Sequence, residues 1–197
     1  MVKFGGELKG AKIGCVMTGS FCTFKEVFAV WSALKQEGAD LLPIMSYNAY
    51  STDTRFYPAK QAVGIFEEIC KGKVLHTIDQ VEPIGPKKLL DLLIVAPCTG
   101  NTLAKIAHGI TDTPAALAVK SHLRNGRPVL LAVSTNDALS SSAINIGKLL
   151  NTRNIFFVPF RQDDPQNKPN SCVAVFEKTV ESAALALENR QIQPVLT

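Results

Sequence analysis

The chain has 197 residues, of which 46% are hydrophobic and 19% charged, with a formal net charge of +4 at pH 7. This composition excludes a disordered chain, and the longest apolar run, Leu89 to Ala96, is far shorter than the ~20 residues of a membrane span. The basic residues are scattered and only 7% of residues are aromatic, so nucleic-acid binding is not indicated, although a small anionic ligand would suit the positive charge.

The hydrophobic pattern predicts strands and helices that alternate along the chain. The expected strands cover 11–17, 41–45, a possible short segment at 74–75, 89–95, 129–133 and, as the last, 155–158. The expected helices cover 23–37, 59–70, a segment opening at 98–102 and ending at 108, 113–124, a segment after 137 ending near 150, and 172–189. The stretches 46–57 and 161–170 are polar and are expected to be loops.

Strands separated by helices form β-α-β units with right-handed crossovers and a parallel sheet. We therefore expect an α/β fold with three layers, a flavodoxin-like (Rossmann-like) doubly wound parallel sheet of five or six strands. The length and the absence of a linker predict one domain over residues 1–197. Five cysteines without a C-x-x-C pair, together with three widely spaced histidines, favour reduced thiols in a cytoplasm and no metal site.

Small polar loops follow three of the expected strands, at 18–20, 99–102 and 134–137, and a fourth strand ends in Ser46. In parallel sheets ligands bind beyond the carboxyl ends of the strands, where glycine allows close approach and helix N-termini attract anions. These loops therefore predict a site for one phosphate. The alternative for each loop is that its hydroxyls only cap the following helix.

Several common signatures are missing. The chain has no G-x-G-x-x-G or Walker loop, and its second strand ends in Ser46 to Asn48 rather than in an acidic residue, so a mononucleotide is favoured over a dinucleotide. No catalytic group can be assigned from spacing. We expect Cys98 to be a buried structural thiol, His122 to be solvated, and Asp163 and Asp164 to lie in a solvated turn.

The segment from Ala96 to Asp112, APCTGNTLAKIAHGITD, resembles the signature of the flavoprotein family of phosphopantothenoylcysteine decarboxylase, the lantibiotic cysteine decarboxylases and the flavin prenyltransferases. The resemblance implies an FMN site, and the positions that match flavin contacts are Gly19, Ser20, Phe21, Ser46, Thr99, Gly100, Asn101 and Thr102, with Ser134 and Thr135 at the neighbouring strand end. The decarboxylases' histidine has no counterpart between Ser46 and Cys70, and Ser134 and Thr135 stand where the prenyltransferases use an arginine.

Over nearly its whole length the chain also resembles the family of dipicolinate synthase B chains, in segments such as STDTRF at 51–56 and NIFFVPF at 154–160. This resemblance implies a cytoplasmic homo-oligomer that works with a separate A chain in the mother cell of sporulating bacteria. The A chain would hold NAD(P), and a dihydrodipicolinate-type ring would be oxidised to pyridine-2,6-dicarboxylate.

A dicarboxylate substrate needs cationic and amide or hydroxyl partners. Arg55 is the candidate carboxylate clamp because a guanidinium binds a carboxylate through two parallel hydrogen bonds, and the alternative is that it is a surface charge. The other candidate substrate contacts are Asn48, Thr52, Asn136 and Lys168. Two further hypotheses stay open, a non-catalytic subunit that stabilises its partner and an FMN-dependent cysteine decarboxylase.

Overall fold

A computed structural model describes residues 8–197. Its strands are β1 (Lys12–Met17), β2 (Asp40–Met45), β3 (Leu92–Cys98), β4 (Val129–Thr135), β5 (Ile155–Phe157), β6 (Phe160–Gln162) and β7 (Cys172–Ala174). Its α-helices are α1 (Phe24–Gln36), α2 (Tyr47–Ser51), α3 (Ala59–Cys70), α4 (Ile78–Val81), α5 (Gly100–His108), α6 (Pro114–Leu123), α7 (Ala143–Leu150) and α8 (Thr179–Leu187). None of the helices in this described part is long and apolar enough to cross a membrane.

The strands form one seven-stranded sheet in the order β2-β1-β3-β4-β7-β6, with β5 pairing beside β4. The pairs among β1 to β5 are parallel, whereas β7 runs antiparallel to both β4 and β6. Strand β5 pairs with the first half of β4 and β7 pairs with its last two residues, Ser134 and Thr135. The doubly wound α/β fold is thus confirmed, and the antiparallel hairpin is added at the end of β4 that carries a predicted loop.

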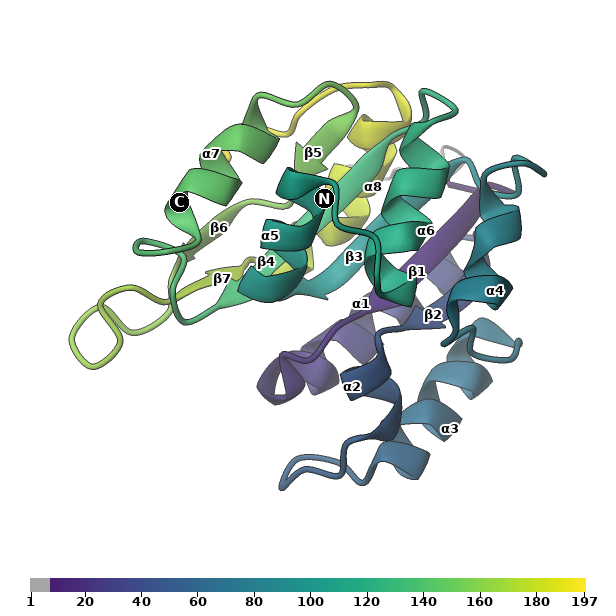
Figure 1. Cartoon of the computed structure of the whole chain (residues 1–197), viewed down its shortest axis with the longest axis horizontal. Coiled ribbons are helices and arrows are strands. Elements are labelled where there is room, and N and C mark those ends of the chain that lie inside the picture. The colour runs from purple at the N-terminus through teal and green to yellow at the C-terminus, as the bar shows by residue number, and fades with distance from the viewer. Residues whose placement is uncertain (1–7) are drawn as a thin grey trace.

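Helices cover both faces of the sheet and give the three expected layers (Figure 1). On one face α1, α3 and α8 bury a cluster that includes Trp31 and Phe66. On the other face α5, α6 and α7 bury a second cluster that includes Leu103 and Val119. Strand β3 is buried at every residue, which agrees with its continuous apolar sequence.

The structure corrects several predicted elements. The segment 155–158 is not the last strand, because β6 and β7 follow it, and residues 172–174 pair in the sheet rather than opening the final helix, which begins at Thr179. The helix expected after residue 137 begins only at Ala143, and the expected loop 46–57 contains the short helix α2. Leu75 makes only an isolated bridge to Ile44. Short strands and single-turn helices carry too little periodicity to be read from sequence.

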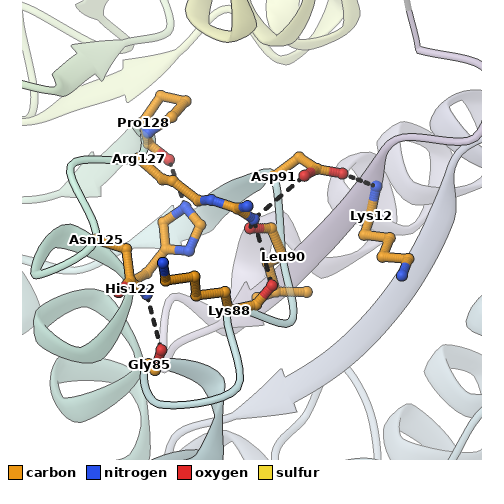
Figure 2. A network of polar contacts seen from close by, with 9 residues as sticks. All are labelled: Lys12, Gly85, Lys88, Leu90, Asp91, His122, Asn125, Arg127 and Pro128. Carbon is orange, nitrogen blue, oxygen red and sulfur yellow. Dashed lines mark hydrogen bonds and ion pairs between the residues drawn. The ribbon is translucent and has the colours of Figure 1, made fainter.

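A polar network ties together the starts of β1 and β3 and the turn before β4 (Figure 2). The Asp91 carboxylate accepts from the Lys12 backbone N–H at 3.0 Å and pairs with Arg127 at 3.2 Å, and Arg127 also donates to the Leu90 carbonyl. These contacts lie at the opposite edge of the sheet from the predicted ligand loops, so they hold strand register rather than a ligand.

His122 is buried, which corrects the expectation that it is solvated. Its Nε2 donates to the Pro128 carbonyl at 3.0 Å. Burial lowers the pKa of His122 to about 4, even though the bond to Pro128 acts in the opposite direction. The ring is therefore neutral and structural at physiological pH.

Candidate functional site

A cavity of 680 Å³ opens where the carboxyl ends of β1, β3 and β4 meet the β6–β7 hairpin. All three predicted loops contribute to it, which confirms that they share one edge of the sheet. Its wall is formed by Gly19, Ser20, Phe21, Cys22, Thr23, Arg55, Phe56, Thr99, Gly100, Asn101, Ser134, Thr135, Asn136, Asp137, Asp163, Lys168, Ser171, Cys172 and Val173.

Hydrogen bonds join the three loops to one another. Thr18 Oγ1 donates to the Pro97 carbonyl at 2.7 Å and accepts from the Thr99 backbone N–H at 3.1 Å. The Ser20 and Ser134 hydroxyls lie 2.7 Å apart and connect the tips of β1 and β4. The floor of the cavity is therefore a cross-linked platform of hydroxyl and backbone groups.

Helix capping accounts for part of this polar set. Thr99 Oγ1 accepts from the Thr102 N–H at 3.3 Å and caps α5, and Ser46 Oγ accepts from the Ala49 N–H at 3.3 Å and caps α2. Ser20 and Ser134 cap no helix. The two readings of the loops thus apply to different residues, and the hydroxyls of Ser20 and Ser134 are the ones not explained by capping.

Asp137 is a wall residue that sequence reasoning missed. Its carboxylate accepts from the hydroxyls of Thr135 at 2.5 Å, Ser141 at 2.7 Å and Ser142 at 2.9 Å. Partial burial raises the pKa of Asp137, but these hydrogen bonds outweigh it and lower the pKa below the usual value. The carboxylate is therefore charged at neutral pH and holds the turn after β4 in one shape.

Two cations reach the cavity from opposite loops. The Arg55 guanidinium lies 4.9 Å from the centre of the Phe56 ring and forms no ion pair within residues 8–197. Lys168 Nζ lies 3.4 Å from the Asp163 carboxylate, in the loop between β6 and β7. The expectation that Asp163 is only a solvated turn residue is corrected, because it lines the cavity and pairs with Lys168.

A second hollow of 210 Å³ adjoins the first and shares Gly19, Thr99 and Asn101 with it. The predicted residues Ser46, Asn48 and Thr102 line this smaller hollow. Of the predicted site residues, Thr52 lines neither one, and its backbone N–H instead ends α2 by donating to the Asn48 carbonyl.

The remaining wall residues come from a part of the chain that was assigned wrongly. Ser171, Cys172 and Val173 lie at or in β7, which the sequence pattern placed in a helix. Cys98, in contrast, is fully buried as expected, and burial raises the pKa of its thiol well above the usual range. Among residues 8–197 no group of three or more His, Cys, Asp or Glu side chains could hold a metal.

The sequence profile described as Flavoprotein matches residues 2–185. The chain belongs to the flavoprotein family. This family assignment covers every strand of the sheet and all the loops that build the cavity.

Individual relatives within the flavoprotein family narrow the comparison. The chain is 43% identical to the B subunit of dipicolinate synthase from Bacillus subtilis (strain 168), over 96% of its own length and 95% of that protein. The crystal structure of the corresponding dipicolinate synthase polypeptide from Bacillus halodurans superposes with a TM-score of 0.89 at 40% identity, over 96% of this chain and 97% of that one. The FMN-dependent cysteine decarboxylase SpaF, at 17% identity, a TM-score of 0.67 and coverage of 93% and 99%, shares the fold.

Proposed function

We propose that this chain is the B subunit of a dipicolinate synthase, which acts with an A subunit to oxidise a dihydrodipicolinate-type ring to pyridine-2,6-dicarboxylate during sporulation. The observation that carries this proposal is the 43% identity over nearly the full length of both chains. Formation of the aromatic ring removes two electrons and two protons from the precursor. The complex must therefore bind a dianion and an electron acceptor.

FMN is the cofactor that we propose for the cavity. The volume of 680 Å³ lies within the range of about 300–1,000 Å³ that is typical of small-molecule sites. Ser20 and Ser134 offer hydroxyls that cap no helix, and Gly19 and Gly100 leave room for close approach to the backbone. When bound, FMN would supply a two-electron acceptor beside the substrate.

The proposed flavin contacts are divided between the two hollows. Gly19, Ser20, Phe21, Gly100, Asn101, Ser134 and Thr135 line the large cavity, whereas Ser46 and Thr102 line the small one and Thr99 lines both. The small hollow contains hydroxyl and amide side chains and no charged ones. An extended mononucleotide that reaches from one hollow into the other would contact the whole set.

The dicarboxylate would be bound at the mouth of the large cavity. Arg55 offers a planar guanidinium without an acidic partner among the described residues, and the Asn136 amide lies on the same wall. Lys168 would contact a second carboxylate only by moving away from Asp163. We therefore propose Arg55 as the main clamp and Lys168 as a weaker one, with Asn48 reaching the ligand from the small hollow.

The remaining parts of the proposal concern assembly. We propose that the A subunit holds NAD(P), that the B chain is a homo-oligomer forming one domain over residues 1–197, and that the complex works in the cytoplasm of the mother cell. The +4 net charge agrees with an anionic substrate.

The test starts with the purified full-length chain. Release of FMN on denaturation, or saturable binding of added FMN that quenches flavin fluorescence, is expected. Reconstitution with the A subunit should then oxidise the precursor faster than either polypeptide alone. Absence of any rate increase from adding the B chain would reject the proposed function.

A second candidate, a non-catalytic subunit, is favoured by the state of the cavity's acids. Asp137 is engaged by three hydroxyls and Asp163 by Lys168, so neither carboxylate is an obvious proton acceptor. A colourless chain that binds neither FMN nor pyridine-2,6-dicarboxylate, yet stabilises the A subunit, would favour this candidate. Release of carbon dioxide from a peptidyl cysteine would instead indicate the cysteine decarboxylase hypothesis.

A further inference from the structure

A separate groove of 390 Å³ lies between α5 and α6, away from the cavity at the strand ends. The two helices pack side by side on the same face of the sheet (Figure 1). The groove is lined by Lys105, Ile106, Gly109, Ile110, Thr111, Ala116, Val119, Lys120, Leu123 and Arg124. Half of these side chains are apolar, and the charged ones are all cations.

The groove has a fixed shape. The αL conformation of Gly109 ends α5, and the Ile110 N–H donates to the Lys105 carbonyl at 2.9 Å. Lys105 Nζ also binds both carboxylate oxygens of Asp112, at 2.7 and 2.8 Å. The loop between the helices is therefore tied at both ends, and a preformed groove loses little entropy when a partner binds.

Apolar surface and positive charge occur together at this groove. Ile110 is 47% exposed beside the helix ends. Lys120 and Arg124 lie one helical turn apart on α6, and neither forms an ion pair within residues 8–197. An exposed apolar residue beside two unpaired cations is complementary to an amphipathic segment that carries acidic side chains.

We propose that this groove docks an acidic amphipathic segment of the partner subunit, in which apolar residues cover Ile110 and carboxylates pair with Lys120 and Arg124. The proposal rests on the proposed function in one respect, namely that a partner subunit exists. A second copy of this chain fits less well, since a two-fold symmetric contact through the groove would place these cations against themselves.

The position of α5 connects this groove with the cavity. Thr99 and Gly100, at the beginning of the helix, line the cavity, and Lys105 and Ile106, toward its end, line the groove. Nine residues of α-helix span about 13 Å. A protein docked at the groove would thus lie one short helix away from the bound ligand.

The experiment measures binding of the A subunit to the full-length chain by calorimetry, at low and at physiological salt. Ile110→Glu and the double variant Lys120→Glu/Arg124→Glu should each weaken binding by about tenfold or more, because a rim of wrong charge and a buried carboxylate both oppose docking. The loss in the double variant should shrink as salt is raised. Leu196→Glu and Lys60→Glu serve as matched controls, since both residues are exposed and lie outside the groove.

Circular dichroism and the melting temperature establish that each variant is folded. Wild-type binding with unchanged affinity in both groove variants would overturn this inference and leave the proposed function intact. Equal weakening in the controls would also overturn it. Failure of the wild-type chain to bind the A subunit at all would reject the partner itself, and with it this inference.

Discussion

Gly100 and Asp137 are in such close contact that a side chain at residue 100 would collide with the Asp137 carboxylate. A Cβ built on Gly100 would lie 2.6 Å from Asp137 Oδ1, and it would also come within 2.7 Å of the Ser142 and Thr135 hydroxyls. The first residue of α5 therefore packs directly against the hydrogen-bonded turn that follows β4. Because of this contact, the tips of β3 and β4 form one wall of the cavity.

Gly100→Ala should destabilise the protein by about 1–3 kcal/mol, because the added methyl group must push the turn after β4 away from α5. Ligand binding should weaken at the same time, since Ser134 and Thr135 move with the turn. Urea unfolding and FMN titration would measure the two effects. Gly64→Ala is the matched control: Gly64 is a helical glycine with open space around it, so alanine there should stabilise by about 0.5–1 kcal/mol. Equal effects of the two substitutions would contradict the contact.

Asp137→Asn should reduce stability by about 1 kcal/mol at neutral pH, because the hydroxyls of Thr135, Ser141 and Ser142 then lose a charged acceptor. The lowered pKa of Asp137 means that its carboxylate contributes stability above pH 3.8, the ordinary value, and loses this contribution as pH falls through the lower folded-state pKa. The difference between variant and wild type should therefore vanish in acid. Unfolding curves from pH 7 to pH 2 would test this, with Asp40→Asn, at an exposed site on β2, as the control.

His122 should make the fold sensitive to mild acid. Its pKa of about 4 in the folded state lies below the ordinary 6.5, so the neutral ring contributes stability above pH 6.5 that is lost as pH falls toward 4. The loss should approach about 1.4 kcal/mol per pH unit in this window. His122→Gln, which retains a donor for the Pro128 carbonyl, should flatten this part of the stability profile. His108→Gln changes an exposed ring and should leave the slope as in wild type.

Arg55→Lys should weaken binding of pyridine-2,6-dicarboxylate by about tenfold, because the ammonium keeps the charge but loses the two parallel hydrogen bonds. Calorimetry with the purified chain and the KM of the reconstituted two-subunit enzyme are the measurements. Arg161→Lys is the control, since Arg161 is exposed on β6 and lines neither hollow. If Arg55→Lys leaves both the affinity and KM as in wild type, Arg55 is a surface charge and not the clamp.

The alternation of buried strands and amphipathic helices was readable from the sequence, because burial on both faces produces the continuous apolar runs of β3 and β4. The same pattern placed the loops 18–20, 99–102 and 134–137 at one edge, since the carboxyl ends of parallel strands coincide. These elements are defined by local periodicity, and a single sequence contains that information.

The tertiary structure alone decided the rest of the cavity wall. Strands β6 and β7 have three residues each, too few to show a period, and β7 is placed by antiparallel pairing with the end of β4. That pairing brings Asp163 and Lys168 into the wall, and the contact between Gly100 and Asp137 joins segments that are distant in sequence. Local residue patterns therefore determined the sheet and the edge that carries the site, whereas the charges facing a ligand depend on long-range packing that no local pattern records.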